Sequence, residues 1–546
     1  MPNTPPVENA SQSRLIKSLL DKLGNQAPAK RVRLIETHIS WVLLAGHYAY
    51  KIKKALDLGF LDFSSLQARL HYCEEEIRLN CRLAPKIYLD VIAIGGSAEN
   101  PLLGAQPAIE YAVRMRRFAV SKQLDRLVAN NKILARHIDS LAATIATFHR
   151  NLPAADANSS FGTADAVRLA AQQNFEQLQT LLTEPADQEK LAALRRACDS
   201  EYAACLGMFG QGLGLFDQRL AQGFVRECHG DLHLGNIVLI DNQPIPFDGI
   251  EFNPALRWID VMSEVAFTAM DLQYHRRADL ASRFLNAYLE VTGDYAGIPL
   301  LRFYIAYRAM VRAKVSAIRV AQTGLSRHDT TEAWADCHGY LGLAADSLAH
   351  KQAALIITHG LPGSGKTTFA QIALERLQAI RLRSDVERKR LFGIAPLANS
   401  RERTGLDLYS ADVTRRTYAH LRELARGMLL AGYTVIVDAA FLKQHERDSF
   451  HQLADELSVP FVIASLQADT KTLLARIIQR HKSANDASEA DIEVLGKLQL
   501  THEPLSSEEI TIAAEFVNEG EGIAADLAGW SHLSQLLNLS QENRIP

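Results

Sequence analysis

The sequence lacks a strong excess of either charge, and it lacks long apolar runs. Its 59 Lys and Arg residues nearly balance its 62 Asp and Glu residues, which leaves a formal net charge of −3. This balance gives no overall reason to expect binding to nucleic acid or to an anionic membrane. No stretch reaches the run of about 20 apolar residues that spans a bilayer, and the polar start, MPNTPPVENASQSR, has no apolar signal core. We therefore expect a cytoplasmic protein with neither a membrane nor a nucleic acid as its partner.

Cysteine is also scarce, and no repeat is present. The six Cys residues are scattered, without CxxC or another metal-binding spacing, which is typical of reduced thiols and excludes a disulfide framework. With 47% hydrophobic and 22% charged residues, the composition is that of a globular protein. The 546 residues exceed what one hydrophobic core usually holds, so we expect at least two domains.

Two patterns divide the chain. We predict a disordered lead over residues 1–13, one domain over residues 14–349 and a second over residues 350–546. The first domain begins with alternating strand-like segments around a Ser-capped amphipathic helix and then has mainly helical spacing. In the second domain, short apolar strands alternate with helices, which indicates a parallel sheet. The predicted fold class is therefore α+β followed by α/β.

A dense polar run, HGDLHLGN, lies between apolar neighbours at residues 229–236. Asp231 and Asn236 have the D-x-x-x-x-N spacing of a kinase catalytic loop, in which the Asp orients the attacking hydroxyl and the Asn holds a metal ion. After a short strand and a turn, FDGIEF places Asp248 where a second metal ligand is expected. Phosphoryl transfer depends on such positioning and charge neutralisation. The alternative is a structural turn in which Gly and Asn supply left-handed backbone.

These two motifs together resemble the aminoglycoside phosphotransferase and choline kinase branch of the protein-kinase-like fold. The resemblance covers roughly residues 30–345 in element order. It implies Asp231 as the catalytic base, Asn236 and Asp248 as Mg²⁺ ligands, Lys51 as a contact to the ATP phosphates and Glu76 as its partner. Lys53 and Glu75 are competing assignments, and Lys51 could instead be an exposed strand lysine. The segment IEYAVRM would be the linker at which adenine binds.

For some residues of this domain the sequence allows two different roles. The turn ETHISW lacks the Gly-rich sequence that covers the phosphates in protein kinases, so His38 and Ser40 are alternative donors. Arg308 and Arg312 lie four apart on one face of a predicted helix. They could grip an anionic substrate, although a solvated helix face is the favoured interpretation. Glu251 could be a third carboxylate for metal or substrate.

A second motif, GLPGSGKTT at residues 360–368, fits the P-loop pattern G-x-x-x-x-G-K-[ST]. An apolar strand precedes it and a helical segment follows, which is the context that the motif requires. Backbone N–H groups of such a loop bind phosphates at a helix N-terminus, Lys366 reaches the β- and γ-phosphates, and Thr367 and the strand-ending Asp438 bind Mg²⁺. The predicted nucleotide-binding residues are Gly360, Gly363, Ser364, Gly365, Lys366, Thr367 and Thr368.

The segments after the P-loop resemble those of small P-loop kinases, including polynucleotide kinases and the zeta-toxin group. The resemblance implies that Asp385 is the base for the acceptor hydroxyl and that Arg388 contacts the acceptor. It also implies that Arg476 and Arg480, four apart on a helix, form a lid over the transferring phosphoryl group. Asp385 as a helix cap and the two arginines as surface residues are the alternatives.

The sequence thus predicts a fusion of two ATP- and Mg²⁺-dependent phosphotransferase domains. Each would transfer a γ-phosphoryl group to a hydroxyl of a small-molecule substrate. In the alternative interpretations one domain is a regulatory nucleotide sensor or ATPase switch, or the P-loop domain phosphorylates nucleic-acid ends.

Overall fold

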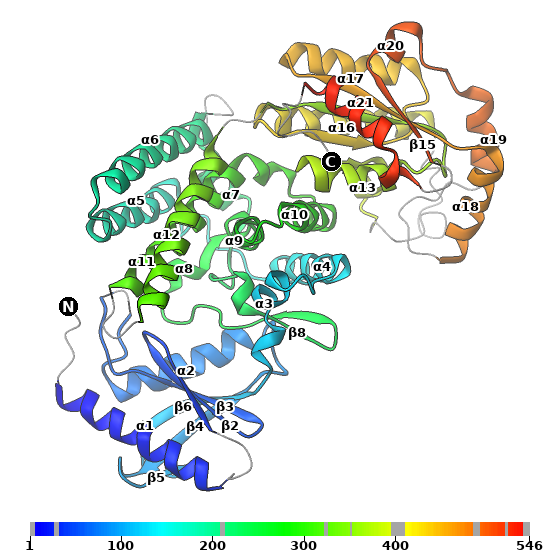
Figure 1. The fold of residues 1–546 in the computed structure, drawn as a ribbon. Coiled ribbons are helices and arrows are strands. Elements are labelled where there is room, and N and C mark those ends of the chain that lie inside the picture. Colours follow the sequence, from blue (N-terminus) through cyan, green and yellow to red (C-terminus); the bar gives the residue numbers. More distant parts are fainter. Residues whose placement is uncertain are drawn as a thin grey trace. The chain divides into compact units, whose positions relative to one another are not determined.

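The computed structural model describes residues 6–26, 32–59, 61–207, 213–321, 326–349, 352–394, 410–483, 492–518 and 522–538 (Figure 1). The chain forms two compact units. The first comprises Met1–His275 and Phe303–Ala344, and the second Arg276–Arg302 and Ala345–Pro546. Within the described ranges, no helix has the length and apolar character needed to cross a membrane.

The first unit contains a six-stranded sheet in the order β1-β2-β3-β6-β4-β5, with antiparallel neighbours throughout. The strands are β1 (Arg33–Glu36), β2 (Ser40–Ala45), β3 (Tyr48–Lys53), β4 (Tyr88–Gly96), β5 (Pro101–Leu103) and β6 (Ala108–Arg116). The IEYAVRM segment lies inside β6, where it pairs with β3 and β4. The expectation that this segment is the linker is therefore wrong, because its alternating apolar side chains are those of an inner strand.

Two helices cover this sheet. Helix α1 (Pro6–Gln26) packs Leu15, Ile16 and Leu19 against one set of strand side chains. Helix α2 (Leu66–Asn80), with Ser65 as its N-cap, packs with the opposite set, to which Ala49 and Val113 belong. Since α1 begins at Pro6, the structure differs from the predicted disordered lead over residues 1–13. Gln12 explains part of the difference, because its buried amide donates to Glu110 at 2.6 Å and accepts from the backbone N–H of Ala55 at 2.8 Å.

The remainder of the first unit is mainly helical. Its helices are η1 (Val120–Lys122), α3 (Leu124–Ala129), α4 (Ala135–Asn151), α5 (Ala164–Leu181), α6 (Pro185–Gly207), α7 (Leu215–Ala221), η2 (Leu234–Asn236), α8 (Pro254–Arg257), α9 (Val261–Tyr274), α11 (Leu301–Val320) and α12 (Arg327–Leu348). Two short antiparallel pairs join β7 (Val225–Glu227) to β10 (Trp258–Asp260) and β8 (Ile237–Ile240) to β9 (Gln243–Pro246).

The second unit contains a five-stranded parallel sheet in the order β12-β13-β11-β14-β15. The strands are β11 (Leu355–His359), β12 (Ile380–Arg383), β13 (Val435–Asp438), β14 (Phe461–Gln467) and β15 (Ala513–Val517). The helices are α10 (Ala278–Thr292), η3 (Tyr295–Leu300), α13 (Lys366–Leu377), α14 (Ser384–Leu391), α16 (Ala411–Leu430), α17 (Gln444–Leu457), α18 (Thr470–Ser483), α19 (Ile492–Thr501), α20 (Ser507–Thr511), η4 (Ile523–Ala525) and α21 (Leu527–Leu536). The parallel sheet and the antiparallel sheet of the first unit confirm the predicted fold class.

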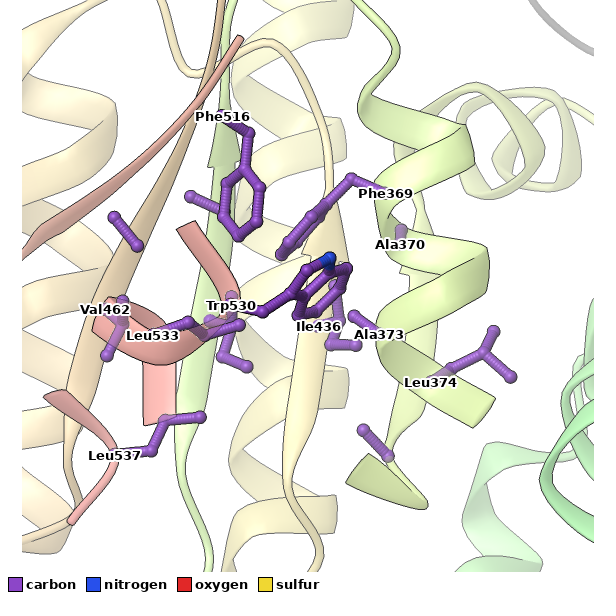
Figure 2. Close-up of a cluster of buried hydrophobic side chains, with 14 of the residues drawn as sticks. Phe369, Ala370, Ala373, Leu374, Ile436, Val462, Phe516, Trp530, Leu533 and Leu537 are labelled. Carbon is purple, nitrogen blue, oxygen red and sulfur yellow. The ribbon is translucent and has the colours of Figure 1, made fainter. Parts of the chain in front are cut away.

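The core of the second unit is aromatic at its centre. Figure 2 shows Phe369 of α13 and Trp530 of α21 beside Phe516 of β15. The rings of Phe369 and Trp530 are stacked, with centroids 5.3 Å apart. Helices α13 and α21 therefore pack on the sheet in one apolar layer. This packing fixes α13, which begins at the end of the P-loop.

Helix α10 belongs to this second unit by its contacts with edge strand β12. The buried amide of Asn286 donates to the carbonyl of Ala379 at 2.9 Å and accepts from the backbone N–H of Arg381 at 2.7 Å. Glu290 forms ion pairs with Arg381 and Arg383. The second unit thus also includes residues 276–302, which a boundary near residue 350 would leave in the first domain. That boundary stays a prediction.

Candidate active sites

The HGDLHLGN loop of the first unit is fixed by hydrogen bonds from α9. The buried carboxylate of Glu264 accepts from the backbone N–H groups of His229 and Gly230, at 3.0 and 2.7 Å. Asp271, two turns further along the helix, accepts from the backbone N–H of Leu234 at 2.8 Å. A single helix thus holds the loop on both sides of the predicted base.

His229 packs beneath this loop as a neutral ring. Its Nε2 lies 2.9 Å from the carbonyl oxygen of Phe247, and its Nδ1 accepts from the backbone N–H of Asp231 at 3.3 Å. These contacts require the proton on Nε2, and burial, which lowers the pKa of His229, favours this form. At Gly230 φ is 87°, and a Cβ atom there would lie 2.8 Å from the carbonyl oxygen of Leu256, so only glycine fits.

Asp231 and Asn236 are in direct contact. The Asn236 amide donates to Oδ2 of Asp231 at 2.8 Å and to its carbonyl oxygen at 3.0 Å. Burial alone would raise the pKa of Asp231, but His233, 3.5 Å away, and Arg312 outweigh it and hold that pKa well below its ordinary value. Asp231 is therefore a carboxylate at neutral pH and can accept a hydrogen bond from a hydroxyl group.

The β8–β9 hairpin brings Asp248 back to this loop. The backbone N–H of Phe247 donates to the carbonyl of Asn236 at 2.9 Å, and that of Ile250 to the carbonyl of His229 at 3.0 Å. Asp248 has a φ of 64°, which is strained for a residue other than glycine. Asn236 and Asp248 thus lie on adjacent segments, as the motif spacing predicts.

A chain of ion pairs joins the half-exposed Asp248 to buried residues of the sheet. Lys51 Nζ lies 2.8 Å from Oε1 of Glu76 and 2.6 Å from Oδ1 of Asp248. Lys53 Nζ lies 2.7 Å from Oε2 of Glu76 and also pairs with Glu251. Because alternate strand residues face the same side, both lysines of β3 reach one carboxylate of α2. The carboxylate of Glu251 is therefore bound in a buried ion pair with Lys53.

The competing candidates take other partners. Glu75 pairs with Arg78 at 2.8 Å, which leaves the contact with the lysines to Glu76. Ser40 is buried at the start of β2, and its backbone N–H donates to Oγ1 of Thr37 at 2.9 Å. His38 is exposed in the same turn. The turn therefore presents His38, and not the Ser40 hydroxyl, to solvent.

The P-loop of the second unit connects β11 to α13 with a backbone that needs glycine. Gly360, Gly363 and Gly365 have φ values of 146°, 86° and 104°. A Cβ atom at Gly360 would lie 2.5 Å from the carbonyl oxygen of Leu466. Lys366 Nζ donates to the carbonyls of Gly360 and Leu361, both at 2.9 Å, so the ammonium group binds the backbone of the loop. Ser364 lies buried inside it, and Thr367 and Thr368 follow in the first turn of α13.

Asp438 and Thr367 meet at the end of the central strands. Asp438 ends β13, and its carboxylate is hydrogen bonded to the Thr367 side chain and lies 3.8 Å from Nε of Arg383. Burial raises the pKa of Asp438, while Arg383 and Lys366 oppose that shift. A hydroxyl and a carboxylate at this position match the oxygen ligands that Mg²⁺ prefers, as do Asp248 and the side-chain oxygen of Asn236 in the first unit.

The remaining predicted residues lie on α14 and α18. Asp385 accepts from Nη1 of Arg388 at 2.9 Å, one helical turn away. Arg476 donates to the carbonyl of Gly363 at 3.2 Å and to that of Asn518 at 3.0 Å, so it contacts the P-loop backbone. Arg480 lies on the same helix, but its side chain is outside the described residues.

Sequence reasoning missed several residues that hold these loops, among them Glu264, Asp271 and Asn518. It also missed the buried His359. Glu264 carries no motif. Asn518 donates to the carbonyl of Ser364 at 2.9 Å, but it follows β15, a short strand that our sequence analysis does not predict. His359 precedes the P-loop, and its Nε2 lies 3.1 Å from Nε2 of His502. The only available signal for His359 is its place directly before Gly360.

The chain is similar to several known proteins. A family model described as an AAA domain matches residues 355–505. A choline/ethanolamine kinase family protein from Mesorhizobium loti is 11% identical, with a TM-score of 0.37 over 61% of this chain and 99% of that chain. A putative kinase from Chloroflexus aurantiacus is 20% identical, with a TM-score of 0.27 over 35% of this chain and 100% of that chain.

The fold and the motifs together describe a first unit with an antiparallel sheet and the HGDLHLGN loop, and a second unit with a parallel sheet and a P-loop. The uncharacterized protein Rv2004c of Mycobacterium tuberculosis is 30% identical to this chain over 457 residues, which span 83% of this chain and 87% of that protein. The chain belongs to the same family as Rv2004c.

Proposed function

We propose that the chain is an ATP- and Mg²⁺-dependent phosphotransferase with two nucleotide sites, each acting on a hydroxyl of a small-molecule acceptor. The observation that carries the proposal is the arrangement in the first unit. There, an ionised Asp231 contacts Asn236, and Asp248 is linked through Lys51 to Glu76. Phosphoryl transfer needs little covalent chemistry from a protein and much positioning and charge neutralisation.

In the first site, Asp231 accepts the proton of the acceptor hydroxyl. The hydroxyl oxygen bonds to the γ-phosphorus while the bond from that phosphorus to the β–γ bridging oxygen breaks, and ADP leaves. Asn236 and Asp248 would hold Mg²⁺, which neutralises phosphate charge when bound. Lys51 contacts the phosphates, and Glu76 keeps its ammonium group in place.

In the second site, the loop from Gly360 to Thr368 binds the phosphates through its backbone N–H groups. Lys366 would move from the loop carbonyls to the β- and γ-phosphates, and Thr367 and Asp438 would hold Mg²⁺. Asp385 receives the acceptor proton and Arg388 contacts the acceptor. The AAA-domain match over residues 355–505 supports this assignment.

A substrate screen with site-specific variants tests the proposal. The full chain is incubated with ATP, Mg²⁺ and a library of hydroxyl metabolites and 5′-hydroxyl oligonucleotides, and ADP formation is measured. Asp231→Asn should slow one set of acceptors by about 10²–10⁴-fold, and Lys366→Ala should abolish the other. If either variant leaves every turnover unchanged, the affected unit is a sensor or switch. Turnover confined to oligonucleotides would make the P-loop unit a nucleic-acid end kinase.

Asp385→Asn separates a kinase from an ATPase switch in the second unit. It removes a base for the acceptor but leaves the phosphate-binding loop intact, so transfer should fall by about 10²–10⁴-fold at near-normal nucleotide affinity. Lys366→Ala, by contrast, should weaken nucleotide binding in calorimetry. Unchanged turnover in Asp385→Asn would support the switch.

A further inference from the structure

Helix α11 carries two arginines beside the catalytic loop of the first unit, and they occupy different environments. Arg308 is buried, and its guanidinium donates to the carbonyl of Gly230 and to the carbonyl and hydroxyl of Ser263, each at 3.2 Å. It also lies over the Phe267 ring, 4.9 Å from the centroid. The expectation of a solvated helix face is therefore wrong for Arg308, which anchors α11 to the loop.

Arg312 lies one turn further along the same helix and is partly exposed. Its guanidinium is 5.6 Å from the ring centroid of Tyr340, whose hydroxyl donates to Asp271 at 3.1 Å. Asp271 also accepts from the backbone N–H of Leu234 in the catalytic loop. The anchor at Arg308 and this chain of contacts together place the Arg312 charge next to the loop that carries Asp231.

The hydrogen-bonding capacity of Arg312 is only partly used. Its Nε is buried and has no hydrogen-bond partner among the described residues. Asp271, which accepts from the Tyr340 hydroxyl, also accepts from the backbone N–H of Leu234. The rings of Tyr274 and Tyr340 stack with centroids 3.8 Å apart, and this stacking fixes the Tyr340 ring over which Arg312 lies.

We infer that Arg312 binds an acidic group of the acceptor, so that the first site phosphorylates a hydroxyl compound that already carries a carboxylate or a phosphate. Guanidinium groups bind such anions through paired, charge-assisted hydrogen bonds. An anion held there leaves a hydroxyl of the same small molecule within reach of Asp231. The inference rests on the proposed function of the first unit.

Direct binding tests the inference independently of turnover. The full chain carries Lys366→Ala so that the P-loop contributes little anion binding. Calorimetry then compares glycerol, ethanolamine, glycerate and glycerol 3-phosphate, followed by a wider panel of hydroxy acids and their phosphate esters. We expect the acids to bind more tightly than glycerol and ethanolamine, and Arg312→Gln to weaken that binding by about tenfold or more. The order of glycerate and glycerol 3-phosphate distinguishes a carboxylate from a phosphate.

Two further variants serve as controls. Arg312→Lys keeps the charge but loses the planar fork, so it should restore part of the affinity. Arg196→Gln removes an exposed arginine from α6 and should change nothing. Equal binding of neutral, cationic and acidic compounds, no binding of any acid, or an acid preference that survives Arg312→Gln would overturn the inference.

Turnover separates this inference from the proposed function. With an acidic acceptor, Arg312→Gln should raise KM for the acceptor and leave KM for ATP near its normal value. A rise confined to KM for ATP would assign Arg312 to the nucleotide and overturn the inference. Binding that depends on Arg312, with no turnover that depends on Asp231, would instead contradict the proposed kinase activity and leave the anion site in place.

Discussion

The buried ammonium group of Lys53 lies between two carboxylates, those of Glu76 and Glu251. Burial disfavours its charge, but Glu251 and Glu76 outweigh this effect and raise the pKa of Lys53 well above its ordinary value. Lys53→Met would leave the buried Glu251 carboxylate without its ion-pair partner, and Glu76 would keep only Lys51. We expect it to lower the free energy of unfolding by about 3–5 kcal/mol, measured by chemical denaturation.

The neighbouring residue supplies a matched control. Lys54 pairs at 2.7 Å with Glu36, whose side chain is 60% exposed. Lys54→Met should therefore cost at most about 1 kcal/mol. Adding Glu251→Gln to Lys53→Met should recover part of the loss. Equal losses in Lys53→Met and Lys54→Met would contradict the role given to the buried pair.

His359, directly before the P-loop, makes the stability of the second unit depend on pH. Burial, then Arg447 and His502, lower the pKa of His359 from 6.5 to about 4. Between these values the unfolded chain binds a proton that the folded chain does not, so stability is greatest above pH 6.5 and falls as the pH drops towards 4. His359→Gln should reduce this slope by at most about 1.4 kcal/mol per pH unit.

Denaturation midpoints measured across this pH range check the expectation. His451, exposed on α17, is the matched control. His451→Gln should leave the slope unchanged. If His359→Gln also leaves it unchanged, His359 is not the group that titrates.

Local spacing explains which site residues could be predicted. Short runs of the sequence contain Asp231, Asn236 and the P-loop residues, and such local motifs can be recognised from the sequence alone. Lys51 and Lys53 could not be separated because they share one face of β3 and one partner, Glu76. Glu264 and Asn518 act on loops distant in sequence, and no local pattern reports such contacts.

At the scale of elements, α10 shows where the pattern of the sequence fails. Its helical spacing is plain, but the same apolar face could pack in either unit, and only tertiary contacts assign it to the second. Strand β15 is short and was not predicted. The apolar alternation of β6 does predict a strand, and it is the family resemblance that places a linker there. The existence of helices and inner strands is thus easier to predict than the elements against which they pack.

We predict that a fragment beginning at residue 350 is less stable than one that retains α10. The fragment lacks Asn286, so the buried carbonyl of Ala379 and the N–H of Arg381 lose their partner at edge strand β12. Each buried polar group left unpaired costs about 1–3 kcal/mol. Linking residues 276–302 to residues 350–546 should raise the melting temperature, as calorimetry would record.

Point variants in the full chain test the same contact. Asn286→Ala should lower the free energy of unfolding by about 1–3 kcal/mol. Val291, exposed on the same helix, is the control, and Val291→Ala should change it by no more than about 0.5 kcal/mol. A stable fragment beginning at residue 350, together with a harmless Asn286→Ala, would show that α10 is dispensable.

At the scale of the whole molecule, each unit has a hydrophobic core of its own. The first unit buries Leu43 between the sheet and α1, and the second buries Phe369 between α13 and α21. Both side chains are fully buried, at 0% exposure. A domain with its own core can unfold as a separate cooperative unit, so we expect two calorimetric transitions from the full chain.

Two core variants determine whether those transitions belong to the two units. Leu43→Ala should cost about 2–5 kcal/mol and lower one melting temperature, because a cavity opens beside α1. Phe369→Ala should cost about 3–5 kcal/mol and lower the other, because Trp530 loses its stacking partner. Differential scanning calorimetry of both variants and of the double variant measures the shifts. If each substitution lowered both transitions equally, or if one transition carried the whole heat, the two cores would unfold together as one cooperative unit.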